Sequence, residues 1–495
     1  MEKLGKFEAI FYPKSLAVIG ASADITKFGT HTLNTLIKFG FKGRIYPVNP
    51  HAGEILGLKS YADLKDIPGC VDLALIAVPA PAVPRVLEDC AARSIGVAVI
   101  NTSGFSETGE EECVKLEREI AKISKEKGIR VIGPNCFGVY CPASGLTLPP
   151  GEYYSRESGN VAFLSQSGGY ADRFCRDAKG WGIRFSKVVS YGNACDLNET
   201  DFLEYLAEDQ ETKIIGMYIE GVKSGQRFLQ TVKEINQKKP VIIWKVGLDE
   251  GGRRAIASHT GALGSRKEIW EAFFKQTGAV RVNSLEELID TVLIFQHLRV
   301  PCGRRIAIIG TGGGSGVDSA DACERAGLSV PVLSTKTVEQ LRMLLPPVGA
   351  SAQNPIDLGN PWTSPSDYKK IIETASLDPQ IDALVTVVWQ LPFFYSRREL
   401  FWSFFQKLVE APAAVGKYLR KPLIMVLCAT PTEAEMLEAE NEWRKIKDRY
   451  IAAGIPLYPT IERAVKATVN FIAYQEYEKR TKARALLHCP PRWSI

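Results

Sequence analysis

Short apolar segments alternate with longer amphipathic segments throughout the chain, and no other feature restricts the possible folds as much. Residues 15–20 are largely apolar and end in glycine, as a buried parallel strand does. A loop at 21–29 and a helix at 30–39 are predicted after it. Such alternation builds a doubly wound parallel sheet, an α/β fold that binds ligands at the carboxyl ends of its strands. The same reasoning predicts further strands at 43–48, 71–78, 96–101 and 130–132, and helices at 82–94 and 110–127.

The length of the chain requires more than one hydrophobic core. With 495 residues, several domains are expected. The segment Pro142–Ser158 is rich in Pro, Gly and Ser, which is typical of a linker, and a new apolar strand begins after it. We therefore predict three domains, at residues 1–145, 146–300 and 303–480.

The composition argues against several classes of protein. The net charge of +5 is spread along the chain, so no nucleic-acid partner is expected. No apolar run approaches the roughly 20 residues of a membrane-spanning helix, and the first residues lack the apolar stretch of a signal peptide. The eleven cysteines show no paired CxxC spacing, which predicts reduced thiols in a cytoplasm rather than disulfides or a zinc site. A cytoplasmic protein with no metal site and no membrane contact is expected.

The first domain lacks the signature of a nicotinamide site. Its first loop, Gly20–Gly29, is not GxGxxG, and the second strand ends in Asn49 rather than in an acid that could bind a ribose diol. The loop instead carries Ser22 and Lys27 at the start of a helix, where backbone N–H groups, the helix dipole and one cation suit a phosphate. The alternative for Lys27 is a solvated surface lysine.

The second domain carries a candidate catalytic pair at two successive strand ends. Its first strand is followed by Ser167, Gly168 and Gly169 at a helix start, which can cradle an anion or can be an ordinary turn. Glu220 follows one later strand, and His259 lies in a segment of small residues after the next, which we predict to be a mobile loop. A carboxylate bonded to an imidazole fixes its tautomer and stabilises its charged form. The alternative is an incidental histidine on a surface loop.

The third domain is predicted to be a partial repeat of the second. A strand, the glycine-rich loop Thr311–Gly316 and a helix recur in it. At the place of Glu220 the repeat has Trp389 and Gln390, and at the place of His259 it has Cys428 followed by Ala, Thr and Pro. It therefore keeps an anion cradle without a nucleophile. The parallel segments are 160–167 with 304–316, 239–245 with 421–427, and 278–288 with 454–464.

The strand-end motifs together resemble a known family. They are residues 11–22, 46–50, 77–81, 101–105 and 132–138 in the first domain, and Ser165–Gly168, Tyr218–Gly221 and Ala257–Leu263 in the second. This set resembles the alpha subunits of ADP-forming acyl-CoA synthetases, in the succinyl-CoA synthetase superfamily. The resemblance implies a Rossmann-like CoA-binding domain followed by two flavodoxin-like domains. It also implies CoA-binding positions at Gly20, Ser22, Lys27, Asn49, Pro50, Val78, Pro79, Ser103, Asn135 and Cys136, although Cys136 can equally be an ordinary buried cysteine.

The resemblance also implies a reaction and a partner. His259 would be phosphorylated, Glu220 would orient it, and its phosphate would lie between two helix starts, at Ser167, Gly168 and Gly169 and at Gly312, Gly313 and Gly314. CoA, a carboxylic acid, phosphate and ADP or ATP would be substrates. Neither glycine-rich loop is a GxxxxGK[ST] phosphate loop, so ADP and its Mg²⁺ are expected on an ATP-grasp beta subunit, in an assembly such as two copies of each. The alternative from another class is a CoA-sensing protein without turnover.

Overall fold

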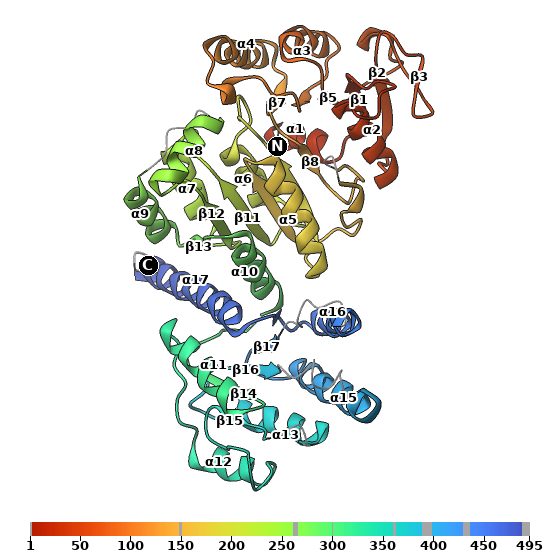
Figure 1. Cartoon of the computed structure of the whole chain (residues 1–495). Coiled ribbons are helices and arrows are strands. Elements are labelled where there is room, and N and C mark those ends of the chain that lie inside the picture. The colour runs from red at the N-terminus through yellow and green to blue at the C-terminus, as the bar shows by residue number, and fades with distance from the viewer. Residues whose placement is uncertain are drawn as a thin grey trace, which may run out of the picture. The chain divides into compact units, whose positions relative to one another are not determined.

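The computed structural model describes residues 2–147, 151–260, 266–298, 300–359, 363–388, 398–428 and 436–487 (Figure 1). They form two compact units, Met1–Leu288 and Ile289–Ile495. The first unit contains two large sheets and the second unit contains one. The three domain boundaries expected from the sequence stay a proposal, because the first two predicted domains lie within one compact unit.

The first sheet has five parallel strands in the order β2-β1-β5-β6-β7. β1, β5 and β6 are buried along their whole length, which explains why they appear in the sequence as apolar runs. The predicted strands and helices are all present, and Figure 1 shows α3 and α4 side by side. Their bounds are β1 Ser15–Ile19, β2 Arg44–Val48, β5 Leu73–Ile76, β6 Val97–Ile100, β7 Arg130–Ile132, α2 Phe28–Phe39, α3 Val83–Ala92 and α4 Glu111–Lys127. Elements not predicted are α1 Glu2–Phe11 and the hairpin of β3 Glu54–Ile55 and β4 Leu58–Lys59.

The second sheet has six strands in the order β13-β12-β11-β9-β10-β8. Five are parallel, and β8 pairs antiparallel with β10 at the edge. β8 is formed by the segment that leaves the first sheet. The strands are β8 Gly138–Tyr140, β9 Val161–Ser165, β10 Phe185–Ser190, β11 Ile214–Ile219, β12 Val241–Lys245 and β13 Val280–Val282. The helices are α5 Gly168–Gly180, α6 Glu199–Glu208, α7 Gly225–Ile235, α8 Glu250–Thr260, α9 Lys267–Thr277 and α10 Leu285–His297.

Polar and aromatic contacts join the two sheets of the first unit. Arg130 in β7 forms an ion pair with Asp196, with 2.9 Å between Nε and Oδ2, and the same carboxylate accepts the N–H of Val131 at 2.8 Å. The rings of Phe7 and Phe11 from α1 both stack on Tyr205 in α6. One apolar core extends across these elements, so the two sheets form a single unit rather than two tethered domains.

The third sheet repeats the second. Its five strands lie in the order β15-β14-β16-β17-β18, which matches β10-β9-β11-β12-β13 strand for strand. The predicted repeat is therefore confirmed. The strands are β14 Ile306–Gly310, β15 Ile356–Asp357, β16 Ala383–Val388, β17 Leu423–Leu427 and β18 Leu457–Tyr458. The helices are α11 Gly313–Arg325, α12 Thr335–Arg342, α13 Pro365–Ser376, α15 Arg398–Gly416, α16 Leu437–Ala452 and α17 Ile461–Leu487.

The segment before and around His259 differs from its prediction. We expected a mobile loop at the histidine, but residues 250–260 form α8. The glycines lie only in the first turn of this helix, and Arg253, Arg254 and Ala255, which follow them, have high helix propensity. The imidazole of His259 and residues 261–265 lie outside the described part of the structure. Within that part, no helix has the length and apolar character needed to cross a bilayer.

Candidate active site

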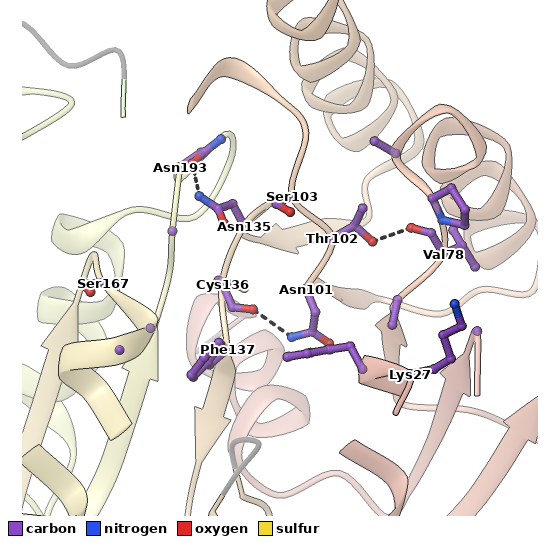
Figure 2. A pocket seen from close by; sticks show the side chains of 18 of the residues that line it. Lys27, Val78, Asn101, Thr102, Ser103, Asn135, Cys136, Phe137, Ser167 and Asn193 are labelled. Atoms are coloured by element: carbon purple, nitrogen blue, oxygen red, sulfur yellow. Dashed lines mark hydrogen bonds between the residues drawn. The ribbon is translucent and has the colours of Figure 1, made fainter. Parts of the chain in front are cut away.

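A cavity of about 810 Å³ opens in the first unit, between the strand ends of its two sheets (Figure 2). Both sheets contribute walls to it. The predicted residues that line it are Gly20, Ser22, Lys27, Val78, Pro79, Ser103, Asn135, Cys136, Ser167, Gly168, Gly169 and Glu220. The structure thus places most of the predicted CoA-binding positions and the predicted catalytic carboxylate around one space.

The first loop is shaped by Gly20 and closes on the start of α2. Gly20 has a φ of 95°, and a Cβ there would lie 2.5 Å from the carbonyl oxygen of Ala77, so only glycine fits. The N–H of Ser22 donates to the hydroxyl of Thr30 at 2.9 Å, and that hydroxyl donates back to the Ser22 carbonyl at 2.8 Å. Lys27 immediately precedes α2, is exposed, and forms no ion pair with another described residue. A free cation beside a helix N-terminus suits a phosphate.

Two other predicted CoA residues lie outside the cavity. The side-chain amide of Asn49 donates to the carbonyl of Ala21 at 2.6 Å, and its oxygen accepts the N–H of His51 at 2.8 Å. Pro50, the next residue, is exposed. Neither Asn49 nor Pro50 is among the cavity-lining residues. Asn49 therefore ties the end of β2 to the first loop.

Where the first sheet lines the cavity, side chains form hydrogen bonds between the ends of neighbouring strands (Figure 2). The hydroxyl of Thr102 donates to the carbonyl of Val78 at 2.6 Å, and the amide of Asn101 donates to the carbonyl of Cys136 at 3.0 Å. Asn135 has a φ of 57°, and its amide reaches the side-chain oxygen of Asn193 at 3.4 Å. These bonds fix the main chain around the cavity.

The thiol of Cys136 is directed into the protein. Its Sγ lies 3.4 Å from the carbonyl oxygen of Ile100, and the residue is 3% exposed. Burial raises the pKa of Cys136 to about 12. These contacts favour an ordinary buried cysteine over a thiol that acts on CoA.

The predicted anion cradle of the second sheet has the geometry of a capped helix start. Ser167 is the N-cap of α5, and its hydroxyl accepts the N–H of Tyr170 at 3.4 Å. The first N–H groups of a helix have no partner within the helix and carry its positive dipole end. A Cβ on Gly168 would lie 2.9 Å from the ring of Phe137, so glycine lets this helix start approach the first sheet closely.

Glu220 follows β11 and is only 6% exposed. Its Oε1 accepts a hydrogen bond from the hydroxyl of Tyr218 at 3.3 Å. Its Oε2 is buried and has no hydrogen-bond partner within the described ranges. A buried carboxylate oxygen without a partner is costly, so this atom is available to a donor that enters the cavity.

One N–H group of the glycine-rich loop in the second unit is already hydrogen-bonded to a side chain of the same unit. Gly312, with a φ of 97°, is the N-cap of α11, and its N–H donates to the carboxylate of Asp357 at 2.9 Å. The N–H groups of Gly313 and Gly314 remain at the helix start. Asp357 belongs to a segment for which the sequence suggested no role, and it also accepts the N–H of Gly359 at 3.0 Å.

Several cavity residues were missed in the sequence, although they lie beside predicted ones. Gln166 stands within the predicted cradle motif, and its side-chain oxygen accepts the N–H groups of Glu220 and Gly221 at 2.7 and 3.0 Å. The amide of Asn193 donates to the carboxylates of Glu107 and Glu117 at 2.6 and 2.7 Å. No short motif reveals such contacts, because each joins segments far apart in the sequence. No group of three or more His, Cys, Asp or Glu side chains that could hold a metal was found among the described residues.

Known proteins resemble this chain in sequence and in domain content. The sequence matches family profiles for a CoA binding domain at residues 14–142, a succinyl-CoA ligase-like flavodoxin domain at 158–295 and a ligase-CoA domain at 306–453. It is 36% identical to the alpha subunit of ADP-forming acetate–CoA ligase I of Pyrococcus furiosus, over 96% of this chain and 99% of that one. It is 40% identical to the alpha subunit of ADP-forming acetate–CoA ligase II of the same organism, over 76% of this chain and 81% of that one.

A solved structure extends this likeness to the whole chain. The dinucleotide-forming acetyl-coenzyme A synthetase 1 of Ca. Korarchaeum cryptofilum, in complex with phosphate and ADP, matches with a TM-score of 0.81 and 33% identity, over 97% of this chain and 98% of that one. High identity to two alpha subunits, the three matched domains and the shared structure lead to one conclusion. The chain belongs to the family of alpha subunits of ADP-forming acyl-CoA synthetases, which are acid–thiol ligases.

Proposed function

We propose that this chain binds an acyl-CoA in the cavity of its first unit and passes a phosphoryl group through His259. An oxygen of inorganic phosphate attacks the thioester carbonyl, the C–S bond breaks, and CoA leaves as its thiol with an acyl phosphate as the other product. An imidazole nitrogen of His259 then attacks phosphorus and displaces the carboxylate. ADP finally takes the phosphoryl group from the histidine and becomes ATP, and the reverse sequence makes acyl-CoA.

One observation carries the proposal: Lys27 and Glu220 line a single cavity, and Figure 2 shows Lys27 and Ser167 on opposite sides of it. At one end, Lys27 and the start of α2 suit the phosphates of CoA. The start of α5 and Glu220 both line the same cavity. A thioester that extends along this space would bring its reacting carbon to the second sheet, where the anion-binding groups are.

The second sheet offers charge stabilisation suited to phosphoryl transfer. The first N–H groups of α5 can bind phosphate oxygens with the positive end of the helix dipole. The unpartnered Oε2 of Glu220 can accept the N–H of an imidazole, which fixes the tautomer of His259 and stabilises the cation formed when the ring is phosphorylated. In the proposed reaction, Gly313 and Gly314 supply the second set of N–H donors.

The nucleotide belongs on a partner in this proposal. The chain has no GxxxxGK[ST] loop, and its curated relatives in Pyrococcus furiosus are named as alpha subunits. We assign ADP and its Mg²⁺ to an ATP-grasp beta subunit, in an assembly of two alpha and two beta chains. All ten cysteines of the described ranges are free thiols, in keeping with a cytoplasmic protein.

Labelling with radioactive phosphate tests the proposal and separates it from a CoA sensor. Incubated with acetyl-CoA and labelled phosphate, the chain and its co-purifying subunit should acquire an acid-labile, base-stable label on His259. His259→Ala should abolish the label, and Glu220→Gln should slow it, because an amide cannot stabilise the imidazolium charge. The matched control is His51→Ala, which removes an exposed histidine outside the cavity and should leave the label intact. If the protein binds CoA tightly but His259 acquires no label, the enzyme proposal is wrong and the CoA-sensor alternative takes its place.

A further inference from the structure

The main chain of Glu220 is held from both sides by side chains of the two neighbouring strands. β11 lies between β9 and β12 in the sheet. From the end of β9, Gln166 accepts the N–H of Glu220 at 2.7 Å. From the end of β12, the ammonium group of Lys245 donates to the carbonyl of Glu220 at 2.9 Å. The peptide groups on both sides of Glu220 are therefore fixed by side-chain bonds in addition to the sheet.

Lys245 is an unusual residue for this position. It is 5% exposed and forms no ion pair with another described residue. Its ammonium also donates to the carbonyl of Val246 and lies 5.2 Å from the ring centre of Trp270. Burial lowers the pKa of Lys245 to about 8, against the opposing effect of the Glu220 charge. A buried cation without a carboxylate partner is costly, so packing alone would favour an apolar residue here.

The second copy of the fold shows that the strand does not require this lysine. In the first copy, Lys245 ends β12 and pairs in register with Ile219, the last residue of β11. In the second copy, Leu427 ends β17 and pairs in register with Val388, the last residue of β16. Leu427 is fully buried. The same sheet position is therefore compatible with an aliphatic side chain.

Gln166 changes together with Lys245 between the copies. Gln166 follows β9 directly, and Thr311 follows β14 directly. The second copy also lacks the glutamate and the histidine in its sequence. The glutamine and the lysine thus occur in the copy that carries Glu220 and His259, and both are replaced in the copy that does not. This pattern indicates that the two residues serve the proposed reaction, because the fold alone does not require them.

We propose that Gln166 and Lys245 are positioning residues that clamp the main chain of Glu220 from the two adjacent strands and so keep its carboxylate directed at the cavity. The inference rests on the proposed function, in which Glu220 orients His259. With its main chain fixed and Oε1 bonded to Tyr218, the carboxylate has little freedom to turn away.

The test uses methionine, which matches the length of glutamine and is one atom shorter than lysine, and which neither accepts strongly nor donates. Gln166→Met and Lys245→Met should each slow phosphate labelling of His259 by about 10- to 100-fold, the range found when a side chain that orients a metal ligand is removed. The affinity for CoA should stay within about twofold, because both residues lie at the carboxylate end of the cavity rather than at Lys27. The thermal midpoint of Lys245→Met should be unchanged or raised, since a costly buried charge is removed.

Lys239→Met is the matched control. Lys239 lies just before β12, at the opposite end of the strand from Lys245, and also donates to two main-chain carbonyls, those of Leu206 and Asp209, at 2.6 and 2.7 Å. Its loss should lower the thermal midpoint and leave the labelling rate of the folded protein unchanged.

Three results would overturn the clamp. They are wild-type labelling in Lys245→Met and Gln166→Met, a rate loss that only follows a loss of folded protein, and an equal loss of CoA affinity. The variant Glu220→Gln distinguishes a failure of the proposed role of Glu220 from a failure of the clamp alone. If Glu220→Gln labels normally, the proposed role of Glu220 fails; if it labels slowly while both methionine variants label normally, the clamp alone fails.

Discussion

Lys27 offers a direct test of the proposal that the first sheet binds the phosphates of CoA. It precedes α2, lines the cavity, and forms no ion pair with another described residue. A charge-assisted hydrogen bond is worth about 1.5–3 kcal/mol. Because Lys27 is exposed, solvent screening reduces this to about 1–2 kcal/mol. We therefore expect Lys27→Met to weaken CoA binding by about 5- to 30-fold.

Calorimetry with two ligands makes this prediction specific. CoA carries phosphates and pantetheine does not, so Lys27→Met should bind pantetheine as the wild type does. The loss of CoA affinity should shrink at about 1 M salt, where the screening length falls to about 3 Å. The control is Lys38→Met in the last turn of the same helix, where the ammonium already pairs with Glu152 at 3.2 Å. Unchanged CoA affinity in Lys27→Met, or an equal loss for pantetheine, would refute the assignment of phosphates to this helix start.

Four further outcomes are expected from the geometry of the described residues. Gly168→Ala should cost about 1–3 kcal/mol of unfolding free energy in urea, because its Cβ would lie 2.9 Å from an aromatic ring, and should slow phosphate labelling. Gly169→Ala, whose Cβ meets nothing closer than 3.9 Å, should instead gain up to about 1 kcal/mol. Iodoacetamide at pH 8 should modify the exposed Cys70 and spare Cys136, whose pKa is raised by burial to about 12; mass spectrometry of the native protein decides this. Burial lowers the pKa of Lys245 from its ordinary 10.5 to about 8, so the unfolded chain binds more protons between these values and stability rises with pH there. The gain in unfolding free energy in Lys245→Met should accordingly be largest below pH 8 and vanish above about pH 10.5, and a gain independent of pH would contradict the buried charge.

Much of the fold was predictable because a parallel sheet buried on both faces requires apolar strands. β1, β5 and β6 are continuous apolar runs, and the repeat in the second unit preserves the same order of elements. β8 was not predicted, because it is three residues long and its pairing with β10 is not local in sequence. The helix α8 was taken for a loop, since its glycines and small residues suggested flexibility and hid the helix formers that follow.

The candidate site was predictable where function resides in a local motif. The glycines at 20 and 168 and the N-cap Ser167 are required by turns and helix starts, which have sequence signatures. Gln166 and Lys245 were missed, because their partners are main-chain atoms of a neighbouring strand. Only the register of the sheet brings them together, and register cannot be read from residue types alone.

The edge strand β8 has a consequence for how the chain can be divided. A cut at residue 145 falls between the first two predicted domains, but it leaves β8 on the first fragment. The second fragment would then present β10, whose side chains are all buried in the intact chain, as an open edge of unpaired N–H and C=O groups. Such an edge recruits strands from other molecules. Proteins in which the CoA-binding domain is exchanged between enzymes should therefore be soluble only when residues 138–140 stay with the sheet whose edge they pair with.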